Sequence, residues 1–288
     1  MRLIVIMKYN AYAKLNILLN VHGKYFNDYH SIESIMLPVN LYDELDIEII
    51  SGSSDIIIEC SDKQIPQDEN NILYKCAKLF QNKFKIRDGI KIYLHKNIPT
   101  QSGLGGESAD AASLMHFYND TYKLDLSFDS IFYLGRLLSW DVPICYLQKC
   151  IYINDKTNVC EVIVPQPPLY FLLIKPDFGI STKKAFEKLD HINYANADPK
   201  PLLDAFQQSP QKVGKYVYNC FIKTDIRLID EYNLLAQISK EIGFDGFSMS
   251  GTGSCFFGIT TDKTILTNGY NFFYNKYPFV KSTNLMLL

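Results

Sequence analysis

The sequence lacks a long apolar run, a paired-cysteine motif and an excess of charge of either sign. Its 288 residues carry a formal net charge of −2, so the sequence has no excess of positive charge that would indicate binding to nucleic acid or to an anionic membrane. No apolar stretch approaches the roughly 20 residues of a membrane-spanning helix, and the short apolar start lacks the features of a secretory signal. The seven cysteines are scattered and form no Cys-x-x-Cys or Cys/His cluster that would indicate zinc. We therefore expect a cytoplasmic protein with free thiols and with neither a nucleic-acid nor a membrane partner.

Common nucleotide-binding signatures are missing as well. The pattern G-x-x-x-x-G-K-[ST] occurs nowhere. The dinucleotide pattern G-x-G-x-x-G is not formed, and no H-R-D or D-F-G set of a protein kinase is present. A loop of small residues between a strand-like run and a helix-like run stands out instead. Its residues are Pro99, Thr100, Gln101, Ser102, Gly103, Leu104, Gly105, Gly106, Glu107, Ser108 and Ala109.

A loop of this composition at the start of a helix favours an anion. The first backbone N–H groups of the helix have no partner within it, and the helix dipole attracts negative charge there. A simple tight turn is the competing interpretation, and it would prevail for a lone G-x-G-G. This loop allows three close backbone approaches, at Gly103, Gly105 and Gly106, and adds hydroxyls at Ser102 and Ser108. We therefore predict a phosphate-binding loop.

The remaining pattern predicts mixed strands and helices in two domains. Leu45–Ile50 and Asp55–Cys60 are expected to form a hairpin across a Ser/Gly turn. Residues 128–138 are expected to form a helix that buries Phe128, Ile131, Phe132 and Leu138. The proline-rich segment 165–168 predicts a linker, and the boundary is set between residues 160 and 161.

Three ordered motifs carry a resemblance to a known family. The loop pattern Pro-x3-Gly-Leu-Gly-Gly-x-Ser-Ala-Asp-Ala-Ala resembles the phosphate loop of the GHMP kinase superfamily. Ala11–Asn16 is similar to that superfamily's P-x-A-K-x-N strand, and Met249–Cys255 to its M-S-G-S-G-S motif. The resemblance implies an α+β fold with a ribosomal-protein-S5-like N-terminal domain (1–160) and a ferredoxin-like C-terminal domain (161–288). It also implies ATP and Mg²⁺ as cofactors.

Four further segments narrow the resemblance within the superfamily. Residues 28–34, 41–45, 140–145 and 175–182 resemble those of the members that act on a cytidine-diphosphate-linked sugar alcohol. These members phosphorylate a hydroxyl of a methylerythritol derivative in non-mevalonate isoprenoid precursor biosynthesis. Two alternatives stay open: a GHMP kinase for another small alcohol such as mevalonate or homoserine, and a degenerate paralogue that binds nucleotide without turnover. The partner is thus a small molecule, and the chain itself is a monomer or a homodimer.

The resemblance implies Asp141 and Lys14 as catalytic residues. Asp141 would take the proton of the attacking hydroxyl, and the charge of Lys14 would stabilise the phosphoryl group as charge develops. Taken alone, an Asp before Val-Pro is as often a helix cap, and a lone Lys on a strand is usually a solvated edge residue.

The resemblance also implies a substrate site with a slot for cytosine. Tyr29 and Phe186 are the stacking candidates, with Tyr25 as a weaker one, and His30 would hold the edge of the base. Packing in a core is the simpler interpretation of these side chains. The full set of implied substrate-binding residues is Asn16, Tyr25, Tyr29, His30, Thr182, Phe186, Gly251 and Gly253.

Two residues depart from the family pattern near the chemistry. Glu107 stands where a glycine is usual. It would either complement the N-terminus of the helix, which we prefer, or ligate the metal of MgATP. The Mg²⁺ ligand is thus left open, with Ser108 or Glu107 as candidates. Trp140 replaces a small residue beside Asp141 and would narrow the pocket or stack on a substrate.

Overall fold

The computed structural model describes residues 6–24, 30–157, 159–166 and 168–286, and the chain forms two compact units. The first unit takes in the chain up to residue 13 together with 41–98 and 105–148. The second contains 14–40, 99–104 and 149–288. The long strands β1 (Ile6–Lys24) and β2 (His30–Ile50) contribute to both units. The expected domain boundary between residues 160 and 161 remains a prediction.

The first unit packs helices against the second half of β2 and two further strands. Its other elements are β3 (Ile56–Cys60), α1 (Ile72–Phe84), β4 (Gly89–His95), α2 (Gly106–Thr121), α3 (Phe128–Leu138) and α4 (Val142–Leu147). The side chain of Asn71 caps α1 by accepting a hydrogen bond from the backbone N–H of Leu73. Apolar residues of α1, α2, β2 and β4 fill one core that includes Phe80, Tyr118 and Ile92.

The predicted hairpin is wrong, because β4 lies between its two strands. β4 pairs antiparallel with β2 and parallel with β3. The start of β4 packs closely on the chain before β3. The N–H of Ile90 donates to the carbonyl of Asp55, and a Cβ on Gly89 would lie 2.6 Å from that oxygen. The Ser/Gly turn therefore connects strands that are not neighbours.

Helix α3 has the predicted bounds and buries Ile131 as predicted, but two of the other residues expected to be buried are exposed. Ile131, Leu134 and Gly135 are buried, whereas Phe128 and Phe132 are exposed. A Cβ on Gly135 would lie 2.9 Å from the ring of Pro143, so the glycine lets α4 approach this face. The inward direction of the two phenylalanines was therefore predicted wrongly.

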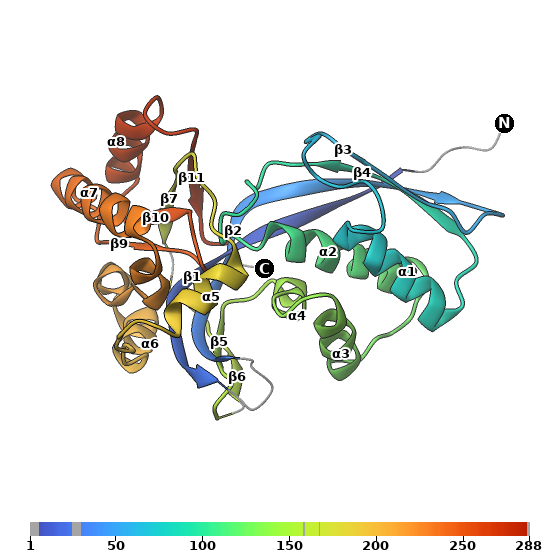
Figure 1. The fold of residues 1–288 in the computed structure, drawn as a ribbon, viewed down its shortest axis with the longest axis horizontal. Helices are drawn as coiled ribbons and strands as arrows, with labels where there is room; N and C mark the ends of the chain where they lie inside the picture. The colour runs from blue at the N-terminus through green and yellow to red at the C-terminus, as the bar shows by residue number, and fades with distance from the viewer. Residues whose placement is uncertain (1–5, 25–29, 158, 167, 287–288) are drawn as a thin grey trace. The chain divides into compact units, whose positions relative to one another are not determined.

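The second unit contains a four-stranded antiparallel sheet of order β11-β7-β10-β9. Its apolar core joins β7, β9 and β10 to α7 and α8, which are labelled beside these strands in Figure 1. The strands that form this sheet are β7 (Tyr170–Lys175), β9 (Gly246–Met249), β10 (Phe256–Thr260) and β11 (Phe279–Asn284). The unit also contains three short strands outside the sheet, which are β5 (Ile151–Asn154), β6 (Val159–Val162) and β8 (Tyr218–Asn219). The helices are α5 (Thr182–Leu189), α6 (Lys200–Gln208), η1 (Pro210–Tyr216), η2 (Cys220–Thr224), α7 (Ile226–Ile242) and α8 (Lys263–Phe273).

Two expectations from composition can be compared with the structure. All seven cysteines are free thiols, as expected. Within the described ranges, none of the helices combines the length and the apolar character needed to cross a bilayer.

Candidate active site

The first half of the glycine loop lies in the second unit, packed against the turn 250–254. Gly103 has a φ of 75°, in the left-handed region, and a Cβ there would lie 2.1 Å from the carbonyl oxygen of Ser250. The hydroxyl of Ser250 donates to the carbonyl of Gly103 over 2.9 Å. Only glycine fits this conformation and this approach together.

Backbone hydrogen bonds extend this contact along the loop. The N–H of Cys255 donates to the carbonyl of Ser102 (3.0 Å), and that of Ser254 to the carbonyl of Gln101 (3.2 Å). Gly253 donates to the carbonyl of Ser250 and closes the turn. The loop and the distant glycine turn therefore support each other through main-chain atoms.

The strand motif of Lys14 and Asn16 joins the same assembly. The N–H of Lys14 donates to the carbonyl of Leu104 (2.9 Å), and the N–H of Asn16 donates to Ser250 Oγ (3.1 Å). Lys14 Nζ donates to Asn16 Oδ1 over 2.5 Å. Both side chains are buried, which disfavours the solvated-edge interpretation of Lys14. The three sequence motifs thus meet within the second unit.

The second half of the loop starts helix α2 in the first unit. Gly105 is the N-cap residue in the left-handed conformation, and its carbonyl accepts the N–H of Ala109 (2.9 Å). In this described segment no side chain caps the helix, so its first N–H groups have no side-chain acceptor there. Glu107 is exposed in the first turn, where a carboxylate complements the helix dipole.

Asp141 occupies the N-cap position of the short helix α4 in the same unit. Its carbonyl accepts the N–H of Cys145 (2.9 Å), but no capping hydrogen bond of its carboxylate is found in the described part of the chain. The capping interpretation therefore lacks support. Ser139, two residues earlier, accepts a hydrogen bond from Ser108 on α2 (3.3 Å). This bond ties the segment before Asp141 to the start of the loop helix.

Trp140 lies beside Asp141 and is 38% exposed. The guanidinium of Arg136, one turn earlier on α3, stacks over the indole ring. A cation over an indole face is attracted by the electron-rich ring. The ring face is thus occupied by a side chain of the protein itself.

His30 and Phe186 lie in contact in the second unit. Their ring centroids are 4.6 Å apart with a tilt of 33°, and His30 Nε2 lies 2.7 Å from Asp190 Oδ1. The hydroxyls of Thr182 and Thr252 are 3.2 Å apart, next to the glycine turn. The other two aromatic candidates, Tyr25 and Tyr29, lie outside the described residues.

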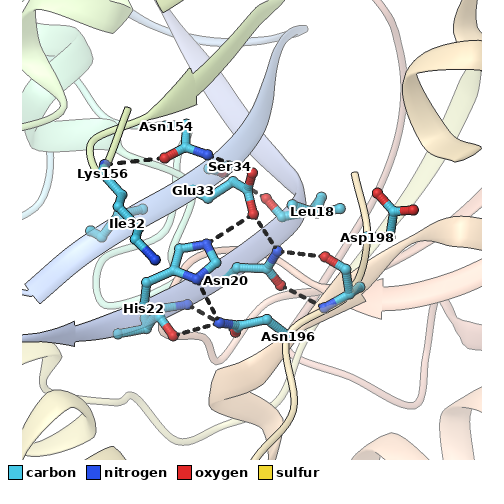
Figure 2. A network of polar contacts seen from close by, with 12 residues as sticks. Leu18, Asn20, His22, Ile32, Glu33, Ser34, Asn154, Lys156, Asn196 and Asp198 are labelled. Carbon is cyan, nitrogen blue, oxygen red and sulfur yellow. Dashed lines mark hydrogen bonds and ion pairs between the residues drawn. The ribbon is translucent and has the colours of Figure 1, made fainter. Parts of the chain in front are cut away.

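A polar network around Glu33 orders the segment that follows α5, the helix of Phe186. Figure 2 shows Glu33 between Asn20, His22 and Asn154. Asn20 in turn exchanges two hydrogen bonds with the backbone of Ala197. Burial raises the pKa of Glu33, but the hydrogen bonds that its carboxylate accepts hold that pKa below its ordinary value.

Several supporting residues were missed by the sequence analysis. The side-chain amide of Asn219 donates to the carbonyls of Met249 and Gly251 (2.7 and 2.8 Å) and so fixes the glycine turn. The signal for Asn219 was that Asn219-Cys220-Phe221 stands where the family usually has N-D-[FL], but that resemblance gave the residue no role. The hydroxyl of Ser250 connects two motifs, but its place in the third motif carried no sign of that.

Comparison with known proteins identifies the class and then the family. A family model described as "GHMP kinases N terminal domain" matches residues 71–149, so this part of the chain, which contains the glycine loop, is similar to the GHMP kinases, an ATP-dependent class. Two relatives named "4-diphosphocytidyl-2-C-methyl-D-erythritol kinase" match almost the whole chain. The one from Clostridium perfringens is 32% identical over 95% of both chains. The one from Clostridium novyi is 33% identical over 94% of this chain and 97% of its own. The chain belongs to the 4-diphosphocytidyl-2-C-methyl-D-erythritol kinase family.

Solved structures agree on the fold. A crystal structure of 4-(cytidine 5'-diphospho)-2C-methyl-D-erythritol kinase covers 98% of this chain, and all of its own chain is covered, with a TM-score of 0.82 at 23% identity. The mevalonate kinase of L. major in complex with R-mevalonate covers 98% of this chain and 97% of its own, with a TM-score of 0.73 at 17% identity. The expected α+β fold of this class is therefore confirmed.

Proposed function

We propose that this chain transfers the terminal phosphoryl group of ATP to a hydroxyl of 4-diphosphocytidyl-2-C-methyl-D-erythritol. The observation that carries the proposal is the packing of Gly103 against Ser250, with Lys14 and Asn16 hydrogen-bonded to the same segments. It supports the proposal because Lys14, whose side chain is buried, is hydrogen-bonded through its backbone to the loop that we propose binds phosphate. The names of the full-length relatives supply the substrate.

The start of α2 fits a triphosphate. Gly105 lacks a side chain that would block an approaching phosphate. The first N–H groups of the helix are uncapped in the described structure and can donate hydrogen bonds to an anion at the helix N-terminus. ATP supplies the phosphoryl group, and Mg²⁺ bound with it would neutralise part of its charge. Ser108 or Glu107 would hold the metal. We still favour Glu107 as a partner of the helix dipole, because its side chain is exposed in the first turn.

Asp141 and Lys14 are the proposed catalytic pair. Asp141 would accept the proton as the substrate oxygen attacks phosphorus, the new O–P bond forms, and the bond to the leaving ADP oxygen breaks. Lys14 would stabilise the charge that develops on the transferred group. Asn16 accepts a hydrogen bond from Lys14 Nζ and so fixes the direction of the amine.

The cytidine end of the substrate is assigned to His30 and Phe186. Phe186 would stack on the base, and His30 would hydrogen-bond to its edge. Mevalonate and homoserine carry no base, so a stacking pair would give them no gain. Thr182, Gly251 and Gly253 would line the phosphate and erythritol part of the site.

A substrate comparison tests the proposal. Purified protein receives MgATP with the cytidine-linked substrate, with mevalonate or with homoserine, and ADP release is recorded. We expect turnover of the cytidine-linked substrate alone. Turnover of mevalonate or homoserine alone would overturn the substrate assignment. No ADP release with any of the three substrates would favour a protein that binds nucleotide without catalysis.

Asp141→Asn tests the proposed base. We expect the rate of transfer to fall by about 10²–10⁴-fold, the usual contribution of general-base catalysis, while the Kd for ATP stays within twofold. Asp129→Asn, at an exposed residue in the first turn of α3, is the matched control. An Asp141→Asn enzyme with the wild-type rate would remove Asp141 from the chemistry.

A further inference from the structure

Three charged side chains of the first unit form a buried cluster behind the glycine loop. Lys96 Nζ lies 2.5 Å from Asp43 Oδ2 and 3.1 Å from Asp110 Oδ2. Asp43 is fully buried and Asp110 is 2% exposed. Two carboxylates and one amine are unusual in an interior, because buried charge is costly unless it is fully paired.

The cluster is connected to both ends of the loop. Asp43 Oδ1 accepts the backbone N–H groups of Asn97 and Ile98 (2.6 and 2.8 Å), the two residues before Pro99. Asp110 lies on α2, four residues after Gly106. A Cβ on Gly106 would lie 3.2 Å from Lys96 Nζ, so the ammonium is packed directly against the loop backbone.

The two carboxylates are not equivalent. Asp43 accepts hydrogen bonds on both oxygens. Asp110 Oδ1 is buried and has no hydrogen-bond partner among the described residues. Asp110 is therefore held through its other oxygen, which accepts a hydrogen bond from Lys96 Nζ.

Lys96 joins the two carboxylates. Its ammonium donates to Asp43 Oδ2 on β2 and to Asp110 Oδ2 on α2. One buried side chain therefore ties the residues before the loop to the helix that follows it.

We propose that Asp43, Lys96 and Asp110 are positioning residues for ATP: Asp43 and Lys96 clamp the start of the loop, and Asp110 holds α2 against Lys96 through their ion pair. This inference deepens the proposed function and rests on the glycine loop binding the phosphates of ATP. None of the three needs to touch the substrate. The cluster fixes the backbone whose N–H groups would do so.

ATP affinity of two isosteric variants tests the clamp. Asp43→Asn replaces an oxygen acceptor with a donor facing either the loop N–H groups or Lys96, and we expect the Kd for MgATP, measured by calorimetry, to rise at least tenfold. Asp129→Asn, at an exposed residue in the first turn of α3, is the matched control, and its Kd is expected to stay within twofold. Equal Kd values for both variants and the wild type would overturn the clamp, even if Asp43→Asn had a lower Tm.

A second variant covers the case in which Asp43→Asn does not fold. Lys96→Arg keeps the positive charge, but the larger guanidinium does not fit against Gly106, so a rise in Kd of at least tenfold is again expected. Lys91→Arg, at an exposed pair with Glu59 on β3, is the control and should bind ATP like the wild type. A Lys96→Arg protein with unchanged Kd would contradict the positioning role.

These measurements are separable from the proposed function. The Kd for ATP requires no phosphoryl transfer. If the wild type binds ATP but does not turn over the cytidine-linked substrate, the substrate assignment fails and the cluster is still tested. If the wild type turns over the substrate and all variants bind ATP equally, only this inference fails.

Discussion

Replacing Gly103 by alanine tests whether the glycine loop and the turn 250–254 really share one packed backbone. The residue has a φ of 75°, and its added Cβ would lie 2.1 Å from the carbonyl oxygen of Ser250 and 3.1 Å from the N–H nitrogen of Gly253. Both neighbours are main-chain atoms of a hydrogen-bonded turn, so neither can rotate away.

Two effects add up at this position. A left-handed conformation costs an L-residue with a Cβ roughly 1–2 kcal/mol. Overpacking of a well-packed site adds about 1–3 kcal/mol, which together predicts a loss of about 2–5 kcal/mol in the free energy of unfolding. Real Cβ atoms essentially never approach within 3.0 Å, so the loop must move by about 1 Å. Misplacement of this size can cost about 100-fold in catalysis.

Gly52→Ala separates the two effects. Gly52 has a φ of 82°, similar to that of Gly103, but nothing lies within 4 Å of a Cβ there. Urea unfolding of both variants should show a loss of about 1–2 kcal/mol for Gly52→Ala and a larger loss for Gly103→Ala. Steady-state kinetics should show a reduced kcat/KM for ATP in Gly103→Ala alone.

The reasoning fails if the two variants behave alike. Equal losses of stability, with wild-type kcat/KM for ATP in both, would mean that the loop does not approach Ser250 as closely as the structure shows. A large loss of stability with normal kinetics in the folded fraction would separate packing from phosphate binding.

Two further predictions concern the second unit. Phe186→Ala should raise the KM for the cytidine-linked substrate about 5- to 150-fold, because base stacking on an aromatic contributes about 1–3 kcal/mol; an equal rise in the KM for ATP would argue against a base slot. Glu33→Gln should lower the free energy of unfolding by about 1–3 kcal/mol at pH 7. The Gln side chain would present an N–H₂ group, itself a donor, to hydrogen-bond donors such as Tyr152 and His22, whose hydrogen bonds the carboxylate now accepts. Because the folded pKa of Glu33 lies below its ordinary value, the deficit should be full above about pH 4.3 and shrink as pH falls through the folded pKa. A pH-independent deficit in urea titrations would contradict the carboxylate's role.

The sequence determined the type of most elements, because periodicity and turn residues are local. The helix of residues 128–138 has the predicted bounds, and the strand before the loop and the loop itself lie where the pattern placed them. The order and spacing of the three motifs also pointed to the right superfamily. The phosphate chemistry of that class depends on short backbone segments, which survive as readable motifs.

The tertiary structure decided which strands pair, which faces are buried and which charges are shared. β4 inserts between β2 and β3 because pairing depends on contacts far apart in the chain, which a turn signal does not contain. Phe128 and Phe132 point outward because α4 covers the other face of α3. In the sequence, Asp110 is only one residue of a motif made mostly of small residues, and nothing there indicates its contacts. Only the structure shows that Asp110 is buried and shares the ammonium of Lys96 with Asp43.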